Sequence, residues 1–431
     1  MRVADRPIPT SIVLDPGALD EWPVRPVFAV EQRRLPPYSW DDGSVWNDPA
    51  TLVWDAASAL PVWSDATCDF TGCEIEFDPP DDHGVYPSAR CVLQLDNRSG
   101  RWARYNVDGS PTDYGAGQQL WIWSLSDTGA TEWLYAGRIA RWDERADDTI
   151  EVEAFDYFSD LAQPVGTFTP GAAGDLPGVR ATAIIAAAAA TLLRTRFAPG
   201  VVHLTAQPTE QSPLEELETV IGSDGGVVLC DADGTIVSTE RTWRTGRSDQ
   251  TTIPVVSTNV CTAPIVLWDP VLSTTDVGLA GTVMLENVAG LRATATKVGA
   301  DGRYILSDAD QQWTTQLEGD KLAADLVAQL WQARLAIDTA DLYLTDPAHP
   351  NLWAAVAWRR LDRIRILHDS RTPTGVARVD VEALISSLYH SITPAGWVMS
   401  FGTTRAFGYI APTFWDQTAL TWDDPAAVWN Y

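Results

Sequence analysis

The chain has 431 residues, 45% of them hydrophobic, which allows about three domains and a sizeable core. It carries 58 acidic and 30 basic side chains, a formal net charge of −28. Such a chain should repel nucleic acids and anionic membranes, since both are bound through Lys and Arg; its charge favours solubility, or a lumen through which DNA slides without adhering.

The N-terminus lacks the apolar core of a signal peptide, and no apolar run reaches about 18 residues. We therefore expect a soluble protein that is made in the cytoplasm, without stable membrane insertion. The five cysteines (68, 73, 91, 230 and 261) match no zinc-binding spacing. Cys68 and Cys73 are close enough in sequence to bridge, but buried thiols are the expected state in a reducing cytoplasm.

Residues 1–67 and 403–431 share one composition, in which Trp is followed by Asp or Asn with Pro or Gly nearby. Asp and Asn close turns on their own backbone, and Trp offers a large apolar face with one N–H donor. We interpret both segments as arms. Their tryptophans either pack on the chain's own domains or dock on another subunit, which makes seven of them interface candidates: Trp40, Trp46, Trp54, Trp63, Trp415, Trp422 and Trp429.

Residues 68–163 alternate apolar with polar side chains in short runs separated by turn residues, most clearly over 91–161. This period is typical of half-buried strands. The spacing of the turns predicts a small antiparallel barrel or sandwich. A Pro/Gly-rich linker follows at 164–178.

Residues 179–250 are predicted to form an α+β insert. An Ala-rich helix is expected over 180–196. A second helix begins after Ser212, with Pro213 at its first position and glutamates in its first turn. A hairpin with an Asp-Gly turn is predicted around 231–234.

Residues 251–402 return to strands, with a pair over 283–288 and 291–296, a long helix over 320–337, and final strands over 363–367, 379–390 and 396–404. Leu322, Leu326 and Leu330 give the helix its apolar face. We expect a second barrel-like domain here.

No residue pattern in the chain predicts catalysis. Phosphate-binding loops, GxSxG and HExxH are missing, and the five histidines (83, 203, 349, 368 and 390) show no ligand spacing. His368-Asp369-Ser370 is interpreted as a turn after a strand. The Asp231-x-Asp-Gly turn lacks the downstream Glu of a calcium loop. We expect no catalytic residues, no metal and no cofactor.

The order of several pieces resembles the tail hub proteins of tailed bacteriophages, which are related to the baseplate hubs of contractile tails and to type VI secretion spikes. These pieces are Leu95–Gly100, Leu134–Ile139 with Ala154–Asp156, Gln211–Leu217, Gly225–Gly226 with Asp231–Gly234, Arg363–Leu367, and Ser391–Trp397. They span about three quarters of the chain. The arms lie outside the resemblance and look like those of minor tail proteins from actinobacterial phages.

The resemblance implies a mainly β fold with two β-barrel-like hub domains, a helix–hairpin insert domain and Trp/Asp-rich terminal arms. It also implies a structural virion protein, a homotrimeric ring at the tail tip. Its partners would be the distal tail protein, the tape measure protein and a central fibre or other minor tail proteins, with DNA only in transit through the lumen. An acidic lumen would keep DNA from sticking.

Two other functions remain open from the sequence. The Trp-rich arms could bind a receptor or a carbohydrate, since Trp stacks on sugar rings. A β-rich glycoside hydrolase would need a pair of carboxylates, but pairs such as Asp41-Asp42 and Asp81-Asp82 lie among turn residues. About 30 residues follow the last predicted strand, too few for a fused catalytic domain.

Overall fold

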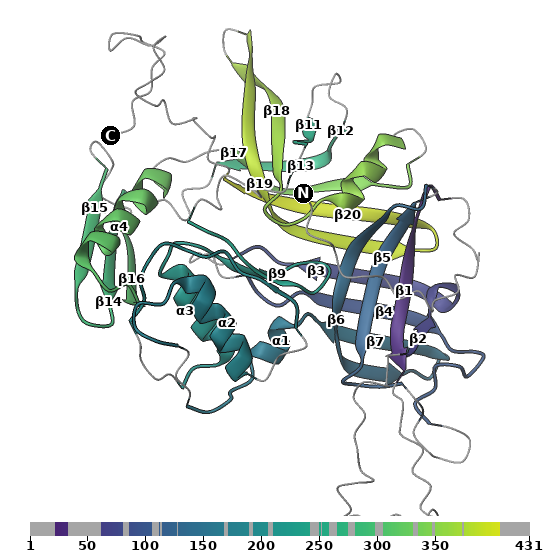
Figure 1. The fold of residues 1–431 in the computed structure, drawn as a ribbon. Helices are drawn as coiled ribbons and strands as arrows, with labels where there is room; N and C mark the ends of the chain where they lie inside the picture. The colour runs from purple at the N-terminus through teal and green to yellow at the C-terminus, as the bar shows by residue number, and fades with distance from the viewer. Residues whose placement is uncertain are drawn as a thin grey trace, which may run out of the picture.

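The structure is a computed structural model. It describes residues 22–32, 62–80, 86–105, 112, 114–126, 128–167, 171–188, 193–205, 210–241, 250, 252–257, 265–274, 281–297, 305–330, 335–346, 350–372 and 375–405. The chain is mainly β, with two smaller sheets and a few helices beside one large sheet, which confirms the expected fold class (Figure 1).

The first β unit consists of β1 (Val24–Gln32), β2 (Val62–Asp65), β3 (Phe70–Phe77), β4 (Arg90–Asp96), β5 (Gln119–Ser126), β6 (Thr131–Glu144) and β7 (Thr149–Phe155), with the 3-10 turn η1 (Thr67–Asp69). Its strands lie in the order β2-β1-β5-β6-β7-β4-β3. Phe28 of β1, the last strand but one at one end, stacks on Phe70 of β3 at the other end, with ring centroids 4.5 Å apart. The unit is therefore barrel-like.

These strands form because alternate side chains can enter one core. In β7, Ile150, Val152 and Ala154 are buried, while the residues between them are partly exposed. Strand β4 alternates in the same way. Since side chains of a strand point to opposite faces in turn, this pattern fixes which face meets the core.

The second β unit consists of β11 (Val255–Ser257), β12 (Ile265–Val266), β13 (Trp268–Thr274), β17 (Leu335–Tyr343), β18 (Arg363–Thr372), β19 (Gly375–Thr393) and β20 (Gly396–Arg405), with the 3-10 helix η3 (Pro350–Ala357). Their order is β12-β11-β18-β19-β20-β17-β13. This is the order of the first β unit, strand for strand along the chain. Strands β11 and β12 differ from β1 and β2 in pairing parallel with their neighbours.

The two units share a bulge at the equivalent place. In β6 the pairing with β7 skips one residue between Ile139 and Arg141, and in β19 the pairing with β20 skips one between Ile385 and Ser387. An irregularity at the same point of the same strand supports a structural repeat, because bulges re-aim a strand at a defined position.

The insert contains α1 (Phe158–Leu161), α2 (Pro177–Ala187), β8 (Thr195–Arg196), α3 (Pro213–Gly222), β9 (Val228–Cys230) and β10 (Ile236–Ser238). Helix α3 begins as predicted. The Ser212 side chain accepts from the Glu215 backbone N–H, and the Glu215 carboxylate accepts from the Ser212 N–H, a complete capping box. The predicted hairpin is confirmed as β9 and β10.

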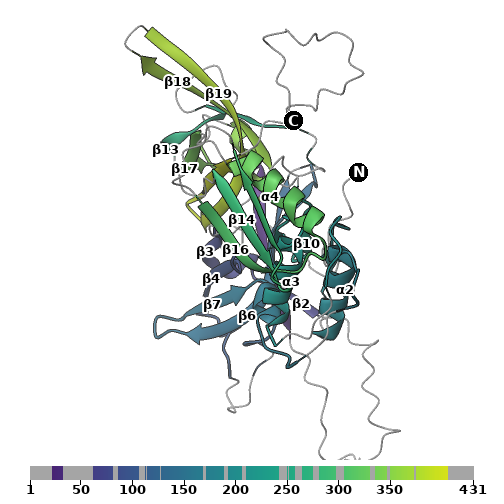
Figure 2. The same cartoon turned by 90° about the vertical axis from the view of Figure 1, so that its left-hand side faces the viewer.

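A third sheet lies between β13 and β17 in the chain. It contains β14 (Thr282–Asn287), β15 (Arg292–Thr296) and β16 (Ile305–Gln311), in the order β15-β14-β16. Helix α4 (Gln316–Leu330) packs on β14 and β15 (Figure 2). Leu285 and Leu322 from this sheet and helix join Leu217 and Val220 of α3 in one buried cluster. The third sheet and the insert therefore form one accessory block.

Several predicted boundaries and one assignment were wrong. Residues 24–32 and 62–65 pair within the first β unit, although their composition placed them in the N-terminal arm. The long helix begins at Gln316 and is followed by β17 from Leu335, so the prediction over 320–337 was shifted by several residues. Helix α2 covers 177–187 rather than 180–196. His368-Asp369-Ser370 lies inside β18, not in a turn.

Across the described part of the chain, every helix is too short or too polar to cross a bilayer.

Candidate assembly interfaces

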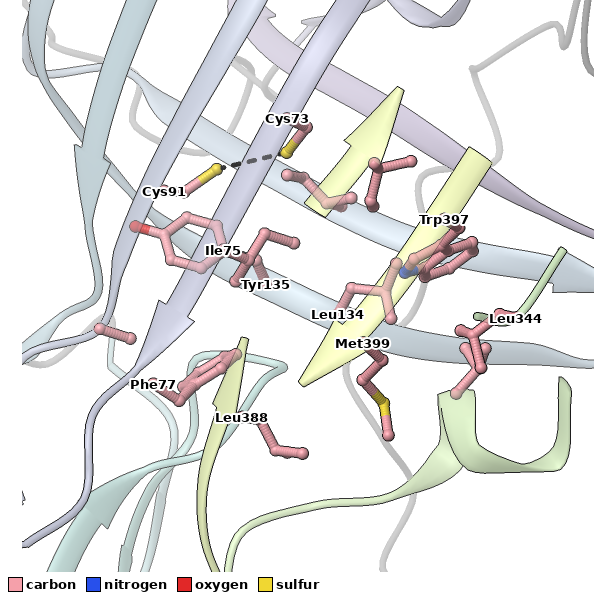
Figure 3. Packing of buried hydrophobic residues seen from close by; sticks show 14 of the residues in the cluster. Cys73, Ile75, Phe77, Cys91, Leu134, Tyr135, Leu344, Leu388, Trp397 and Met399 are labelled. Atoms are coloured by element: carbon pink, nitrogen blue, oxygen red, sulfur yellow. Dashed lines mark hydrogen bonds between the residues drawn. The ribbon is translucent and has the colours of Figure 1, made fainter. Parts of the chain in front are cut away.

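Strand β19 joins the two β units. Its residues Leu388–Ile392 pair antiparallel with Cys73–Phe77 of β3, at the end of the first β unit. The same edge of β19 pairs with β18 up to Leu384, and the opposite edge pairs with β20. Side chains from both units fill one core at this junction, as Figure 3 shows for Ile75, Phe77, Leu388 and Met399. The two units therefore form one continuous body.

Two cysteines lie in this core as thiols. The Sγ atoms of Cys73 and Cys91 are 3.9 Å apart, on the neighbouring strands β3 and β4 (Figure 3). Burial raises the pKa of Cys73 well above its ordinary value, with a further rise from the hydrogen bond to Cys91. Cys68 and Cys73 are both free thiols, as expected, but only Cys73 is buried and Cys68 is exposed. Cys261 lies outside the described residues.

Arg360 connects all three parts of the chain. It precedes β18 and is 3% exposed. Its guanidinium lies 4.9 Å from the ring centroid of Phe77 and 5.0 Å from that of Tyr86, both in the first β unit. It also donates to the backbone carbonyl of Cys230 in the insert hairpin. A cation enclosed by two aromatic faces and a carbonyl fixes the relative position of the parts that supply them.

Asp156 forms a second buried polar group near this junction. Its carboxylate accepts from the Ser88 hydroxyl at 2.6 Å and from the backbone N–H groups of Ala89 and Phe158 at 2.9 and 3.0 Å. Burial raises its pKa above the ordinary value, although these hydrogen bonds and the charge of Arg360 act in the opposite direction. All its contacts are structural, since they tie the strand ends to α1.

The open edge of β6 is the first surface available for assembly. Strand β5 pairs with β6 only up to Arg138. The Gly117 N–H donates to the Ile139 carbonyl and the Ile139 N–H donates to the Gln118 carbonyl, which extends the pairing to Ile139. Beyond Ile139 none of the described strands pairs with this edge. A shallow groove lies here, lined by residues 141–145 with Arg104 and Tyr105. The Tyr105 side chain is 54% exposed in it.

The outer edge of β13 is the second such surface. Among the described strands β13 pairs with β17 alone. Val271 on β13 is 51% exposed, unusual for a strand valine. An unpaired edge with an exposed apolar residue is a place where another chain can pair.

The acidic turn considered as a calcium loop has other partners. Asp231 forms an ion pair with Arg196, and Asp233 with Arg194. The N–H of Gly234 donates to the Asp231 carbonyl, as expected of a hairpin turn. Within the described residues no group of His, Cys, Asp or Glu has the arrangement of a metal site.

The described histidines have structural contacts. His203 pairs with Glu318 at 3.0 Å. His390 is buried, and its Nδ1 accepts from the Trp397 indole N–H at 3.2 Å. Burial lowers the pKa of His390 to about 4, so this ring is neutral in the folded protein at pH 7. His83 and His349 lie outside the described residues.

Of the seven interface candidates, only Trp63 lies in the described part of the chain. It is 7% exposed in β2, and its ring centroid is 4.0 Å from that of Trp121 in β5. It thus packs on the chain's own first β unit. Trp40, Trp46, Trp54, Trp415, Trp422 and Trp429 lie outside the described residues, and their docking role stays a prediction.

Sequence reasoning missed Arg360, the open edge of β6 and Val271. For Arg360 the only signal was Trp358-Arg-Arg360 before a strand, which is too common to predict a buried cation. An open strand edge leaves no sequence signal, because it consists of backbone groups that every residue carries.

No protein-family model and no curated protein matches the sequence. Solved structures of tail proteins resemble this one, among them the following two. The tail protein from Neisseria meningitidis MC58 is 10% identical with a TM-score of 0.55, and the match covers 88% of this chain and 96% of that one. The 43 kDa tail protein of prophage MuSo2 from Shewanella oneidensis is 14% identical with a TM-score of 0.52, over 89% of this chain and 98% of that one.

At these identities the likeness is one of fold. It extends over nearly the whole length of both solved proteins, and so includes both β units and the accessory block. The relationship predicted from the order of the sequence pieces is confirmed at this level: this chain has the fold of phage tail proteins.

Proposed function

We propose that the protein is a structural component of a phage tail, located in the virion, and that it forms the hub of the tail tip as a ring of three copies. The observation that carries this proposal is the repeat of seven strands in the same order in two β units of one chain. Three copies would present six similar units around an axis. Such a ring matches a six-part tube above it and a threefold fibre or spike below.

The proposed partners follow from that position. The distal tail protein would lie above the ring, the end of the tape measure protein inside it, and a central fibre or another minor tail protein below. DNA would touch the lumen only in transit. The net charge of −28 is compatible with a lumen that repels DNA.

A non-enzymatic role is supported by the contacts of the described polar residues. Asp156, Asp231, Asp233, His203 and His390 each hold strands, turns or helices together. The fold likeness to two tail proteins points the same way. Digestion of host cell walls by the purified chain should therefore give no clearing.

The test is the symmetry of the assembled protein. The purified chain should sediment as a trimer, and averaged images of particles containing it should show threefold symmetry with six similar lobes. A single copy on the tail axis, or six copies, contradicts the proposal.

A further inference from the structure

The strand pairing that joins the two β units has an equivalent position elsewhere in the chain, where the two strand edges concerned are unpaired among the described strands. Strand β3 ends the first β unit and pairs with β19 of the second. The repeat makes β13 the equivalent of β3 and makes β6 the equivalent of β19. Both equivalents have an unpaired edge among the described strands. In β13 it is the edge that faces away from β17, and in β6 it is the part of the strand beyond Ile139.

The equivalence can be followed residue by residue. Arg138 is the last residue of β6 that pairs with β5, and Leu384 is the last of β19 that pairs with β18. An isoleucine and the one-residue bulge come next in both strands. Beyond the bulge, Trp142 faces Val152 of β7 as Leu388 faces Phe401 of β20. Counting from the bulge, the β3 pairing at Leu388–Ser391 corresponds to residues 142–145.

The groove beside β6 lies at that position. Residues 141–145 line it, and Arg104 and Tyr105 form its other wall. In the second β unit this edge of β19 is paired with β3. In the first β unit none of the described strands pairs with the same edge of β6 at residues 142–144. The vacant place in the first unit therefore coincides with a groove that has an exposed aromatic wall.

The edge that would fill the groove is Val271–Thr274 of β13. Glu74 of β3 pairs with Val92 of β4, and Val271 of β13 pairs with Thr339 of β17, the equivalent position. In β3 it is Glu74–Phe77 that pairs with Ser391–Leu388. Transferred to the repeat at this residue, Val271 falls opposite Arg145. The pairing of β13 with β17 shifts by one residue directly after Val271, so the register is assigned at Val271.

The groove has a mixed charge. Arg104, Arg141 and Arg145 line it together with Asp143 and Glu144, and Arg141 and Arg145 form ion pairs with Glu151 of the same chain. The exposed Val271 would be covered by the contact. Val271 on one edge and the exposed ring of Tyr105 in the groove are the apolar surfaces that such a contact would bury.

We propose that β13 of one copy adds antiparallel to the open edge of β6 in the next copy, at Trp142–Glu144 and the adjoining Arg145, repeating between chains the contact that β3 and β19 make within one chain. The occupant of the groove is thus a second copy of this protein. This inference rests on the proposed ring of three copies. A contact between β13 of one copy and β6 of the next is head-to-tail, and such contacts form a closed ring only if the rotation between neighbouring copies adds up to a full turn.

Cysteine crosslinking of the full chain tests the register. Val271→Cys and Arg145→Cys are made separately and together, and Cys68→Ser is present in every variant because Cys68 is exposed. Under mild oxidation, the double variant should give bands of two and three chains that disappear on reduction. An equal mixture of the two single variants should stop at two chains, and each single variant alone should stay at one.

A second measurement uses the strength of assembly. Val271→Lys should raise the dissociation constant of the trimer by at least about tenfold, because it places a charge in an apolar contact. Val179→Lys is the matched control, since Val179 on α2 is 59% exposed and lies in the accessory block. The control should assemble like the unmodified chain.

The two proposals fail differently. A trimer that forms without the crosslink, and equally well with Val271→Lys, overturns the β13–β6 contact and leaves the ring intact. A chain that remains a monomer at every concentration overturns both.

Discussion

Ile139 and Ile385 occupy the same position in the two β units. Each is the last paired residue before a one-residue bulge, each is buried, and each follows the residue at which the preceding strand stops pairing. On the far side of the bulge the two strands differ: β19 pairs with β3, and β6 is open on that side among the described strands. The repeat therefore places the β3–β19 contact and the unpaired edge of β6 at equivalent positions.

The bulge itself can be tested. Insertion of one alanine after Ala140 should disrupt the first β unit, because Ala140 is already the extra residue of the bulge and a second one turns the buried Trp142 toward the opposite face of β6. Insertion of one alanine after Ala146, in the turn after β6, is the control and should be tolerated much better. The measurement is the yield of soluble protein and the midpoint of thermal unfolding. Equal midpoints for the two insertions would contradict this interpretation of the bulge.

Arg360→Ala should lower the free energy of unfolding by about 3 kcal/mol, because the change removes a buried cation from two aromatic faces and from a carbonyl. Denaturant unfolding would measure this loss. Arg98→Ala is the control, because the Arg98 side chain is 80% exposed and pairs only locally with Asp96. It should leave the midpoint unchanged, and a similar loss for both variants would remove the special role of Arg360.

Ser212→Ala should destabilise the accessory block by about 1 kcal/mol, because it removes one half of the capping box at the start of α3. Hydrogen exchange of the α3 amides would detect the change in that helix. Thr294→Ala, on an exposed position of β15, serves as the control. Unchanged exchange in α3 would show that packing alone holds this helix in place.

Acid should destabilise the protein partly through His390. Burial lowers the pKa of this ring from 6.5 to about 4, so the folded state binds its proton less tightly than the unfolded state does. The resulting stability is present above pH 6.5 and is lost as the pH falls toward 4, by roughly 3 kcal/mol over that window. His390→Asn keeps an acceptor for the Trp397 indole and should flatten the decline. If the free energy of unfolding falls equally with pH in the variant and in the unmodified chain, His390 does not contribute to the acid sensitivity.

Thiol reagents should distinguish the cysteines. Cys68 is exposed and should be alkylated in the native protein, whereas Cys73, Cys91 and Cys230 are buried. Burial raises the pKa of Cys73 and of Cys230, which keeps both as unreactive thiols. Peptide mapping after brief labelling should find Cys68 modified and the other three modified only in denaturant. Early labelling of Cys73 would show that the junction between the units opens.

Local sequence patterns were enough to predict the separate helices and strands. Alternation predicted the strands, and Ser212-Pro213 with Glu215 predicted the start of α3, because side-chain period and capping act over a few residues. The order of such pieces was also enough to predict the fold family. Two contacts were found only in the folded chain: β3 pairs with β19, about 300 residues later, and Arg360 lies against the rings of Phe77 and Tyr86. Such contacts depend on how distant surfaces fit, and the open edges depend on backbone groups that are alike in every sequence.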